Sequence, residues 1–284
     1  MTSWPAPALR HSSSLRPGGR LGLFQASHRS IFVESAAMDW DGATYDRVST
    51  PQARWGRAVL ERLELEGDET VVDAGCGTGR VTEELLARLP RGRVVALDAS
   101  PSMLEQAQAR LAPAGDRVSF LQANLSELSP SDLDGLCPVD AVLSTATFHW
   151  VTDHDRLFAN LHGILRPGGQ LVAQCGGAGN IATIIEAVRS LGVERAGTWL
   201  YASPQETTER LERAGFSDIH AWSHPELATF QSDSSLVEFL GTVCLREHLA
   251  TIPPSERRPF AEHVAAAMPS TVVDYVRLNI VARA

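Results

Sequence analysis

The chain of 284 residues contains no lysine, and all 25 of its basic residues are arginine. This absence excludes a mechanism that forms a Schiff base on lysine, and it excludes the lysine-containing phosphate-binding loop. The 34 acidic residues outnumber the basic ones, so the formal charge is -9. An acidic chain of this kind is a poor nucleic-acid binder and is poorly suited to a surface of anionic lipid.

Cysteine is scarce, and the four cysteines form no CxxC pair: they are Cys76, Cys137, Cys175 and Cys244. Neither a zinc site nor a dense disulfide framework is expected, so we assign no metal ligands. Reduced thiols are typical of a cytoplasmic protein, which is the expected location. No apolar run approaches the ~18 residues of a membrane span, so we expect no membrane association.

Residues 1–37 differ in composition from the rest of the chain, with four arginines and a single acidic residue, Glu34. Arginine- and serine-rich, acid-poor segments are typical of organelle transit peptides. The alternatives are a disordered tail, or an upstream start codon with Met38 as the true first residue. An arginine- and alanine-rich chain without lysine suggests a GC-rich bacterial genome. We therefore favour a disordered or wrongly assigned extension, followed by one domain over 38–284.

From residue 51 to Cys175, short apolar runs alternate with helical patterns. The expected strands are 70–75, 93–98, 118–124, 140–146 and 170–175, and the expected helices are 51–65, 80–89, 100–112 and 154–166. This alternation predicts an α/β fold, with a parallel sheet covered by helices on both faces. Beyond Cys175 we expect helices over 179–191, 203–216, 234–250 and 255–268, and strands over 217–224 and 274–282. The helices within about 177–200 and 232–268 are interpreted as cap insertions over the sheet.

The first strand runs into a glycine-rich loop, VVDAGCGTG, at 71–79. Gly75 permits a tight turn after the strand, and Gly77 and Gly79 allow the backbone to approach a ligand closely. Asp98 ends the second strand, where an acid can accept hydrogen bonds from both hydroxyls of a ribose. The GxGxG spacing differs from the GxGxxG pattern of dinucleotide-binding proteins.

Together with Asn124 after the third strand and LRPGG before the fifth, these features resemble the class I S-adenosylmethionine-dependent methyltransferases. The resemblance covers about residues 45–284. It implies S-adenosylmethionine as the cofactor. It also implies a Rossmann-like, seven-stranded, mostly parallel sheet whose antiparallel last strand lies beside the fifth.

The resemblance also implies cofactor-binding residues. The glycine loop would lie against the methionyl part, with Asp73 towards its amino group, and Asp98 would hold the ribose. Asn124 stands where the family usually has an aspartate that accepts from the adenine amino group; its carbonyl can still accept. Met103 would line the adenine pocket, with core packing as its alternative role. The full expected set is Asp73, Gly75, Cys76, Gly77, Gly79, Asp98, Ala99, Met103, Asn124, Leu125 and Ser144.

The fourth strand leads into His149 and Trp150, in a position that lies beside the reactive methyl group in this family. This pair, GGAGN at 176–180 and WDGATYDRVSTPQARWG at 40–56 resemble the trans-aconitate 2-methyltransferase group, which implies O-methylation of a small carboxylic acid. The Trp150 indole offers one N–H donor on an apolar ring, which can hold a carboxylate oxygen. Gln52 and Tyr45 are the further catalytic candidates. A carboxylate needs no base, because its pKa is near ~4.

Several alternatives remain open. A hydroxyl, carbon or nitrogen of a small natural product would be a different methyl acceptor, with His149 as base for a hydroxyl. The imidazole has a structural alternative, packed under the cap and hydrogen-bonded to backbone. An NAD(P)-dependent oxidoreductase and a non-catalytic cofactor-binding protein are further possibilities. The three carboxylates of trans-aconitate would require several arginines, and the candidates Arg195, Arg246 and Arg277 are scattered along the sequence. The expected partner is a small-molecule methyl acceptor, and no oligomeric state is predicted.

Overall fold

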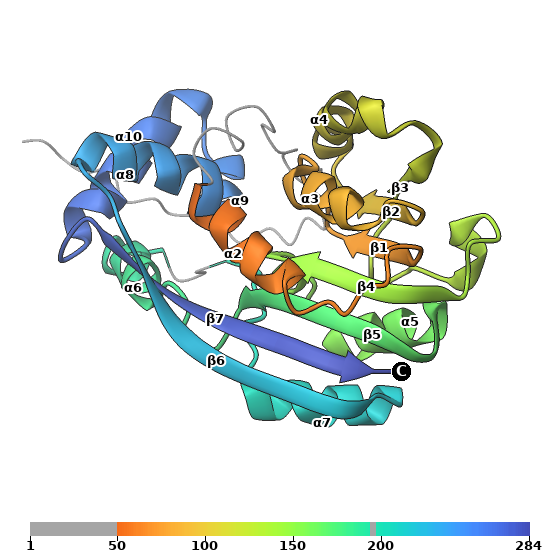
Figure 1. Ribbon diagram of the computed structural model, residues 1–284. Helices are drawn as coiled ribbons and strands as arrows, with labels where there is room; N and C mark the ends of the chain where they lie inside the picture. The colour runs from red at the N-terminus through yellow and green to blue at the C-terminus, as the bar shows by residue number, and fades with distance from the viewer. Residues whose placement is uncertain (1–49, 194–196) are drawn as a thin grey trace, which may run out of the picture. The chain divides into compact units, whose positions relative to one another are not determined.

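The computed structural model describes residues 50–193 and 197–284, which form one sheet with helices on both faces (Figure 1). The strands are β1 (Thr70–Ala74), β2 (Arg93–Asp98), β3 (Val118–Gln122), β4 (Val139–Thr145), β5 (Leu165–Gly176), β6 (Ser217–Thr229) and β7 (Val272–Arg283). Their order is β3-β2-β1-β4-β5-β7-β6; β1 to β5 run parallel, and β7 is antiparallel to β5 and β6. The predicted seven-stranded Rossmann-like sheet, with its antiparallel last strand beside the fifth, is confirmed.

Helices connect most of the strands. They are α2 (Thr50–Leu60), α3 (Arg80–Arg88), α4 (Pro101–Leu111), α5 (His154–Ile164), α6 (Ala182–Ser190), α7 (Pro204–Ala214), α8 (Asp233–Phe239), α9 (Arg246–Ala250) and α10 (Pro254–Ala267). Shorter turns are η1 (Ala112–Arg117), η2 (Pro130–Leu133), η3 (Phe148–Trp150) and η4 (Leu240–Cys244), the last of these a π-helical turn. Within the described ranges, no helix is both long and apolar enough to cross a membrane.

The central strands of the sheet are buried on both faces, which explains why they read as continuous apolar runs. Successive β1 residues show this: Val71 belongs to the apolar cluster under α3 and α4, whereas Val72 belongs to the cluster under α5. Helices α2, α3 and α4 lie on one side of the sheet, and α5 and α7 lie on the other (Figure 1). The parallel strands therefore all end at the same edge, where their connecting loops meet.

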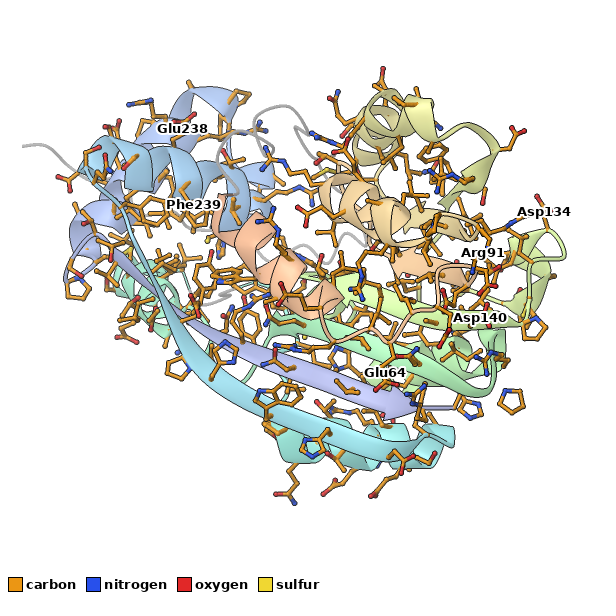
Figure 2. The ribbon with its side chains drawn as sticks, viewed as in Figure 1. Glu64, Arg91, Asp134, Asp140, Glu238 and Phe239 are labelled. Atoms are coloured by element: carbon orange, nitrogen blue, oxygen red, sulfur yellow. The ribbon has the colours of Figure 1, made fainter. Side chains whose placement is uncertain are left out.

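A third apolar cluster holds together the helices at the edge of the sheet where β4 and β5 end (Figure 1). It combines α6, α8, η4 and α10 with Trp55 of α2 and Tyr275 of β7. On α8, Phe239 is buried in this cluster while its neighbour Glu238 is exposed (Figure 2). Helices thus occupy the two ranges interpreted as cap insertions. The predicted boundary at 37/38 lies outside the described residues.

Four elements differ clearly from the sequence prediction. Helix α2 ends at Leu60 and not at residue 65. Strand β5 begins at Leu165, before the PGG sequence, and not at residue 170. Strand β6 extends to Thr229, because β7 pairs with it over its whole length. The helix expected over 234–250 is divided into α8, η4 and α9. A π-helical turn of this kind is often found at functional sites.

Candidate active site

The three glycines of the loop between β1 and α3 differ in what surrounds them. A β-carbon at Gly75, whose φ is +86°, would overlap the side chain of Thr147. A β-carbon at Gly79 would lie 3.2 Å from Cα of Ala107, so this glycine allows α3 and α4 to pack closely. A β-carbon at Gly77 would have no atom within 4 Å. The backbone at Gly77 therefore faces open space, which a ligand can occupy.

That open space belongs to a cavity of about 580 Å³ at the carboxyl ends of the parallel strands. Most of the predicted cofactor residues line it, namely Gly75, Gly77, Asp98, Ala99, Met103, Asn124 and Leu125. In open parallel sheets, ligands bind at this edge. The cavity also reaches Trp150, which the sequence assigned to the methyl acceptor.

The carboxylate of Asp98 connects the glycine loop to the start of α4. Its Oδ2 accepts a hydrogen bond from the Gly77 N–H at 2.9 Å, and its Oδ1 accepts from the Ser100 N–H at 2.9 Å. Ser100 in turn caps α4 by accepting from the Met103 N–H. The predicted ribose-binding acid is therefore held rigidly at the cavity wall.

Asp73 lies behind the glycine loop and does not line the cavity. It is fully buried, and its Oδ2 accepts a hydrogen bond from the Thr82 hydroxyl at 2.6 Å. Its Oδ1 has no hydrogen-bond partner among the described residues. Burial raises the pKa of Asp73 to about 7, although the Thr82 hydrogen bond opposes the shift. A buried carboxylate oxygen without a partner fits a cationic donor such as an ammonium group.

Four further predicted cofactor residues have structural contacts that the sequence did not reveal. The hydroxyl of Ser144 is buried and donates to the Ala74 carbonyl at 2.7 Å, and Cys76 packs into the core beside α3. Gly79 serves helix packing, as described above. The side-chain carbonyl of Asn124 accepts from both the N–H and the hydroxyl of Ser126, at 3.1 and 2.7 Å. These two hydrogen bonds occupy the carbonyl oxygen of Asn124, which lines the cavity, so its amide nitrogen is the group left to contact a ligand in this conformation.

A second, smaller cavity of about 40 Å³ adjoins the first, because Ala146 and Trp150 line both. Its wall is formed by Ala146, His149, Trp150, Asn180, Ile181, Trp199, Tyr201, Val243, Cys244, Tyr275 and Arg277. Ala146 has a φ of +56°, a strained conformation for a residue with a β-carbon, and its N–H donates to the Gln174 carbonyl at 2.7 Å. The end of β4 thus bends at the place where the two cavities meet.

His149 is buried in this wall and remains neutral. Its Nδ1 accepts a hydrogen bond from the Gly176 N–H at 3.3 Å, so in the neutral ring the proton is on Nε2. The ring stacks on Tyr201, with centroids 5.7 Å apart, and tilts against Trp150 at 5.2 Å. Burial, followed by the positive charge of Arg277, lowers the pKa of His149 to about 3. The imidazole is therefore a poor base. Its hydrogen bond to the backbone is the contact expected if His149 has a structural role.

Two of the three candidate arginines lie at these cavities. Arg277 on β7 lines the small one and Arg246 on α9 lines the large one, whereas Arg195 lies outside the described residues. Arg277 is only 2% exposed, and its Nε donates to Oε1 of Gln174 at 3.2 Å. Its guanidinium carbon lies 4.4 Å from the ring centroid of Trp55, a cation–π distance.

The remaining catalytic candidates are not described at side-chain level. Tyr45 lies outside the described residues, and Gln52 is described only as part of the α2 backbone. In contrast, the small cavity is also lined by three aromatic residues that the sequence does not predict as site residues: Trp199, Tyr201 and Tyr275. No local pattern marks the first two, which precede α7 in an irregular segment, or Tyr275, which lies within a strand.

Comparison with known proteins agrees with this architecture. Residues 71–169 match the family described as a methyltransferase domain. The trans-aconitate 2-methyltransferase of Methylobacterium radiotolerans is 30% identical over 242 residues, which cover 81% of this chain and 89% of that protein. The trans-aconitate 2-methyltransferase of Azoarcus sp. is 37% identical over 135 residues, covering 48% of this chain and about half, 50%, of the relative.

Solved structures show the same fold at low sequence identity. The YcgJ protein of Bacillus subtilis has a TM-score of 0.56 and 18% identity, over 81% of this chain and 97% of that one. A phosphoethanolamine N-methyltransferase 2 of Haemonchus contortus, solved with S-adenosylmethionine, has a TM-score of 0.54 and 19% identity, over 85% and 56% of the two chains.

The sheet order, the glycine loop with its cavity and the curated relatives together define the class of this protein. The chain belongs to the class I S-adenosylmethionine-dependent methyltransferases. Within that class it is similar to the trans-aconitate 2-methyltransferases, and its cofactor is S-adenosylmethionine. The donor set fits this cofactor, because the open backbone at Gly77 and the unpartnered oxygen of Asp73 suit its methionyl part.

Proposed function

We propose that this enzyme methylates a carboxylate oxygen of a small carboxylic acid and so forms a methyl ester. The observation that carries the proposal is the buried, neutral state of His149 at the place where the cavities meet. Tyr201, Tyr275 and Cys244 share the small cavity, and burial raises the pKa of each. The described residues of this wall therefore include no group suited to remove a proton near neutral pH. An ionised carboxylate needs none.

In this proposal the chain binds the cofactor through residues of the larger cavity and through Asp73 behind the glycine loop. Asp98 accepts from the ribose hydroxyls while its bonds to the loop keep it in place, and Asp73 accepts from the ammonium group through Oδ1. The adenine lies against Ala99, Met103 and Leu125, and Asn124 donates to it through its amide nitrogen. The resemblance to the family supports the roles of Asp73 and Asp98, and the lining of the cavity supports those of Asp98, Ala99, Met103, Asn124 and Leu125.

When bound, S-adenosylmethionine would supply a methyl group on a positively charged sulfur. The carboxylate oxygen would form the new bond to carbon, and the carbon–sulfur electron pair would stay on sulfur. No proton is transferred, so the residues of the chain act by alignment and by exclusion of water. The reaction neutralises the positive charge on sulfur and the negative charge of the carboxylate. Aromatic surroundings that exclude water favour this neutralisation, because separated charges are less stable in a low dielectric.

Trp150 is the side chain best placed to line up the acceptor, because it lines both cavities. Its ring meets Trp199 edge-on at 6.0 Å, so aromatic surface continues from one residue to the other. We assign it the apolar cover of the acceptor and a hydrogen bond to one carboxylate oxygen. Gln52 and Tyr45 remain predicted residues of the acceptor site. A cytoplasmic location likewise remains a prediction.

The test follows S-adenosylhomocysteine formation with mono-, di- and tricarboxylic acids, each measured beside its carboxamide. We expect turnover with at least one acid and none with its amide, since the amide has no ionised oxygen. Turnover of hydroxylated amides at the same rate as the acids would contradict the proposal and would favour a hydroxyl acceptor.

A further inference from the structure

The small cavity is connected to a buried chain of hydrogen bonds that crosses from β5 to β7. Arg277 donates to Oε1 of Gln174, and Nε2 of Gln174 donates to Oδ1 of Asn279 at 2.7 Å. The same Oδ1 accepts from Arg62 at 2.7 Å. Gln174 is 3% exposed and Asn279 is fully buried, and the two are paired across the strands.

These hydrogen bonds determine which atom of each side-chain amide donates and which accepts. Because the Arg62 guanidinium can only donate, the atom of Asn279 that it contacts is the carbonyl oxygen. Gln174 must then donate to that oxygen through its nitrogen, which leaves its own carbonyl oxygen for Arg277. The guanidinium of Arg277 is therefore held from one side by Gln174 and from one face by Trp55, at the wall of the cavity.

On the premise of the proposed function, we propose that Arg277 binds the carboxylate of the methyl acceptor, and that the acceptor is a monocarboxylic acid whose remainder is flat and apolar. Arg277 is the one cationic side chain among the described residues that line the small cavity. A guanidinium has five N–H donors, and carboxylate is the anion that its geometry suits best. Gln174 and Asn279 are positioning residues for it.

The size and lining of the cavity support a single carboxylate. A volume of about 40 Å³ has room for about three water-sized atoms, which is the size of one carboxylate group. The other polar groups of the wall are all uncharged: the neutral imidazole of His149, the amide of Asn180, the indole N–H groups of Trp150 and Trp199, the thiol of Cys244, and the phenols of Tyr201 and Tyr275. A second carboxylate placed there would be desolvated without a second cation to compensate it. The remainder of the acid would extend past Trp150, which also lines the larger cavity, and the ring of this residue favours a flat apolar group.

The experiment first ranks acids by kcat/KM, with cinnamate, sorbate and octanoate as monocarboxylates and trans-aconitate as the tricarboxylate. The preferred acid and its carboxamide are then titrated into the enzyme saturated with S-adenosylhomocysteine. In the wild-type chain we expect a monocarboxylate to be preferred, and to bind more tightly than its amide. In Arg277→Met we expect the affinity for the acid to fall roughly 10- to 100-fold, with the amide unaffected.

Arg277→Lys and Arg117→Met are the companion variants. Lysine keeps the charge without the fork, so part of the preference for the acid should return. Arg117 donates to the carbonyls of Leu86 and Leu89 and lines neither cavity, so its loss controls for removal of a partly buried arginine. The affinity for S-adenosylhomocysteine should stay within about twofold in all three if they fold as the wild type does.

Three results separate the two proposals. An unchanged affinity for the acid in Arg277→Met, with S-adenosylhomocysteine still bound, contradicts the role of Arg277. Preference for trans-aconitate over every monocarboxylate contradicts the proposed substrate class. If S-adenosylhomocysteine binds but no acid is methylated, the proposed function itself fails.

Discussion

The backbone N–H of Gly176 donates to Nδ1 of His149, and this one bond decides what the imidazole at the end of β4 can do. Protonation of the ring would turn Nδ1 into a donor and would break the bond. Together with the burial that lowers the pKa of His149 to about 3, it keeps the ring neutral at working pH. We therefore expect the histidine to support the proposed acceptor cavity and not to remove a proton from the acceptor.

His149→Gln should keep kcat within about tenfold of the wild type, since an amide oxygen can still accept from Gly176 and an amide N–H can replace the ring N–H. The wild-type kcat should show no ionisation near 6.5, the ordinary pKa of histidine. Both are read from pH–rate profiles between pH 5.5 and 8. A loss of three orders of magnitude, together with a rate that rises through pH 6.5, would restore the role of general base.

Because the pKa of Asp73 is raised, cofactor binding should depend on pH. Its pKa is raised to about 7, so the ionised form that binds an ammonium group is lost as the pH falls below 7. The affinity for S-adenosylhomocysteine should decrease roughly 5- to 10-fold from pH 7.5 to pH 6. Asp73→Asn should bind more weakly and show a flatter pH dependence, measured by calorimetry. Equal pH dependence in the variant and the wild type would exclude this role.

The raised pKa of Asp73 has the opposite consequence for stability. The folded chain without ligand binds a proton at pH values where the unfolded chain has already lost it, between the ordinary value of 3.8 and about 7. The contribution of Asp73 to stability is therefore largest below that range and decreases as the pH rises through 7. Binding of S-adenosylhomocysteine should compensate this loss, as denaturant unfolding at pH 6 and 8 can show.

Gly77 and Gly75 offer a paired test of the glycine loop. A β-carbon at Gly77 meets no atom within 4 Å, so Gly77→Ala should lower stability only by the strain of its positive φ, about 1–2 kcal/mol. Its affinity for S-adenosylhomocysteine should nevertheless fall at least tenfold. Gly75→Ala should unfold at a much lower temperature, because of the overlap with Thr147. Unchanged binding by Gly77→Ala would mean that no ligand approaches this backbone.

Trp150→Ala should separate cofactor binding from turnover. We expect the affinity for S-adenosylhomocysteine to stay within about threefold, while kcat falls about 100-fold or more because the acceptor loses its cover and one donor. Trp150→Phe is the matched variant that keeps the ring surface and loses the N–H. Unchanged turnover in Trp150→Ala would remove this residue from the acceptor site.

Local patterns were sufficient to predict the fold and much of the cofactor cavity. The apolar strands and the loop from Gly75 to Gly79 are contiguous in sequence, and parallel strands bring Asp98 to the same edge of the sheet. The hydrogen bond from Ser126 to the carbonyl of Asn124 is also local, because the two residues are only two positions apart. Asparagine often makes such local bonds at turns.

The acceptor cavity depends on contacts that no local pattern contains. Arg277 meets Gln174 only because β7 pairs with β5 in one particular register, and a shift by one residue would turn it to the other face. The pKa of His149 likewise depends on its burial beside Trp150 and Tyr201 and on the charge of Arg277. Both residues are candidates from the sequence alone, but their convergence on one cavity is a property of the tertiary structure.

The most direct test of the central claim is the chemical nature of the transferred methyl group. The enzyme is incubated with S-adenosylmethionine labelled in the methyl group and with the acid that it turns over fastest, and the product is treated with mild base. A carboxylate acceptor predicts that the label is released as methanol, because a methyl ester is hydrolysed under these conditions. Label that stays on the product would show an ether, amine or carbon-bound methyl group and would contradict the account.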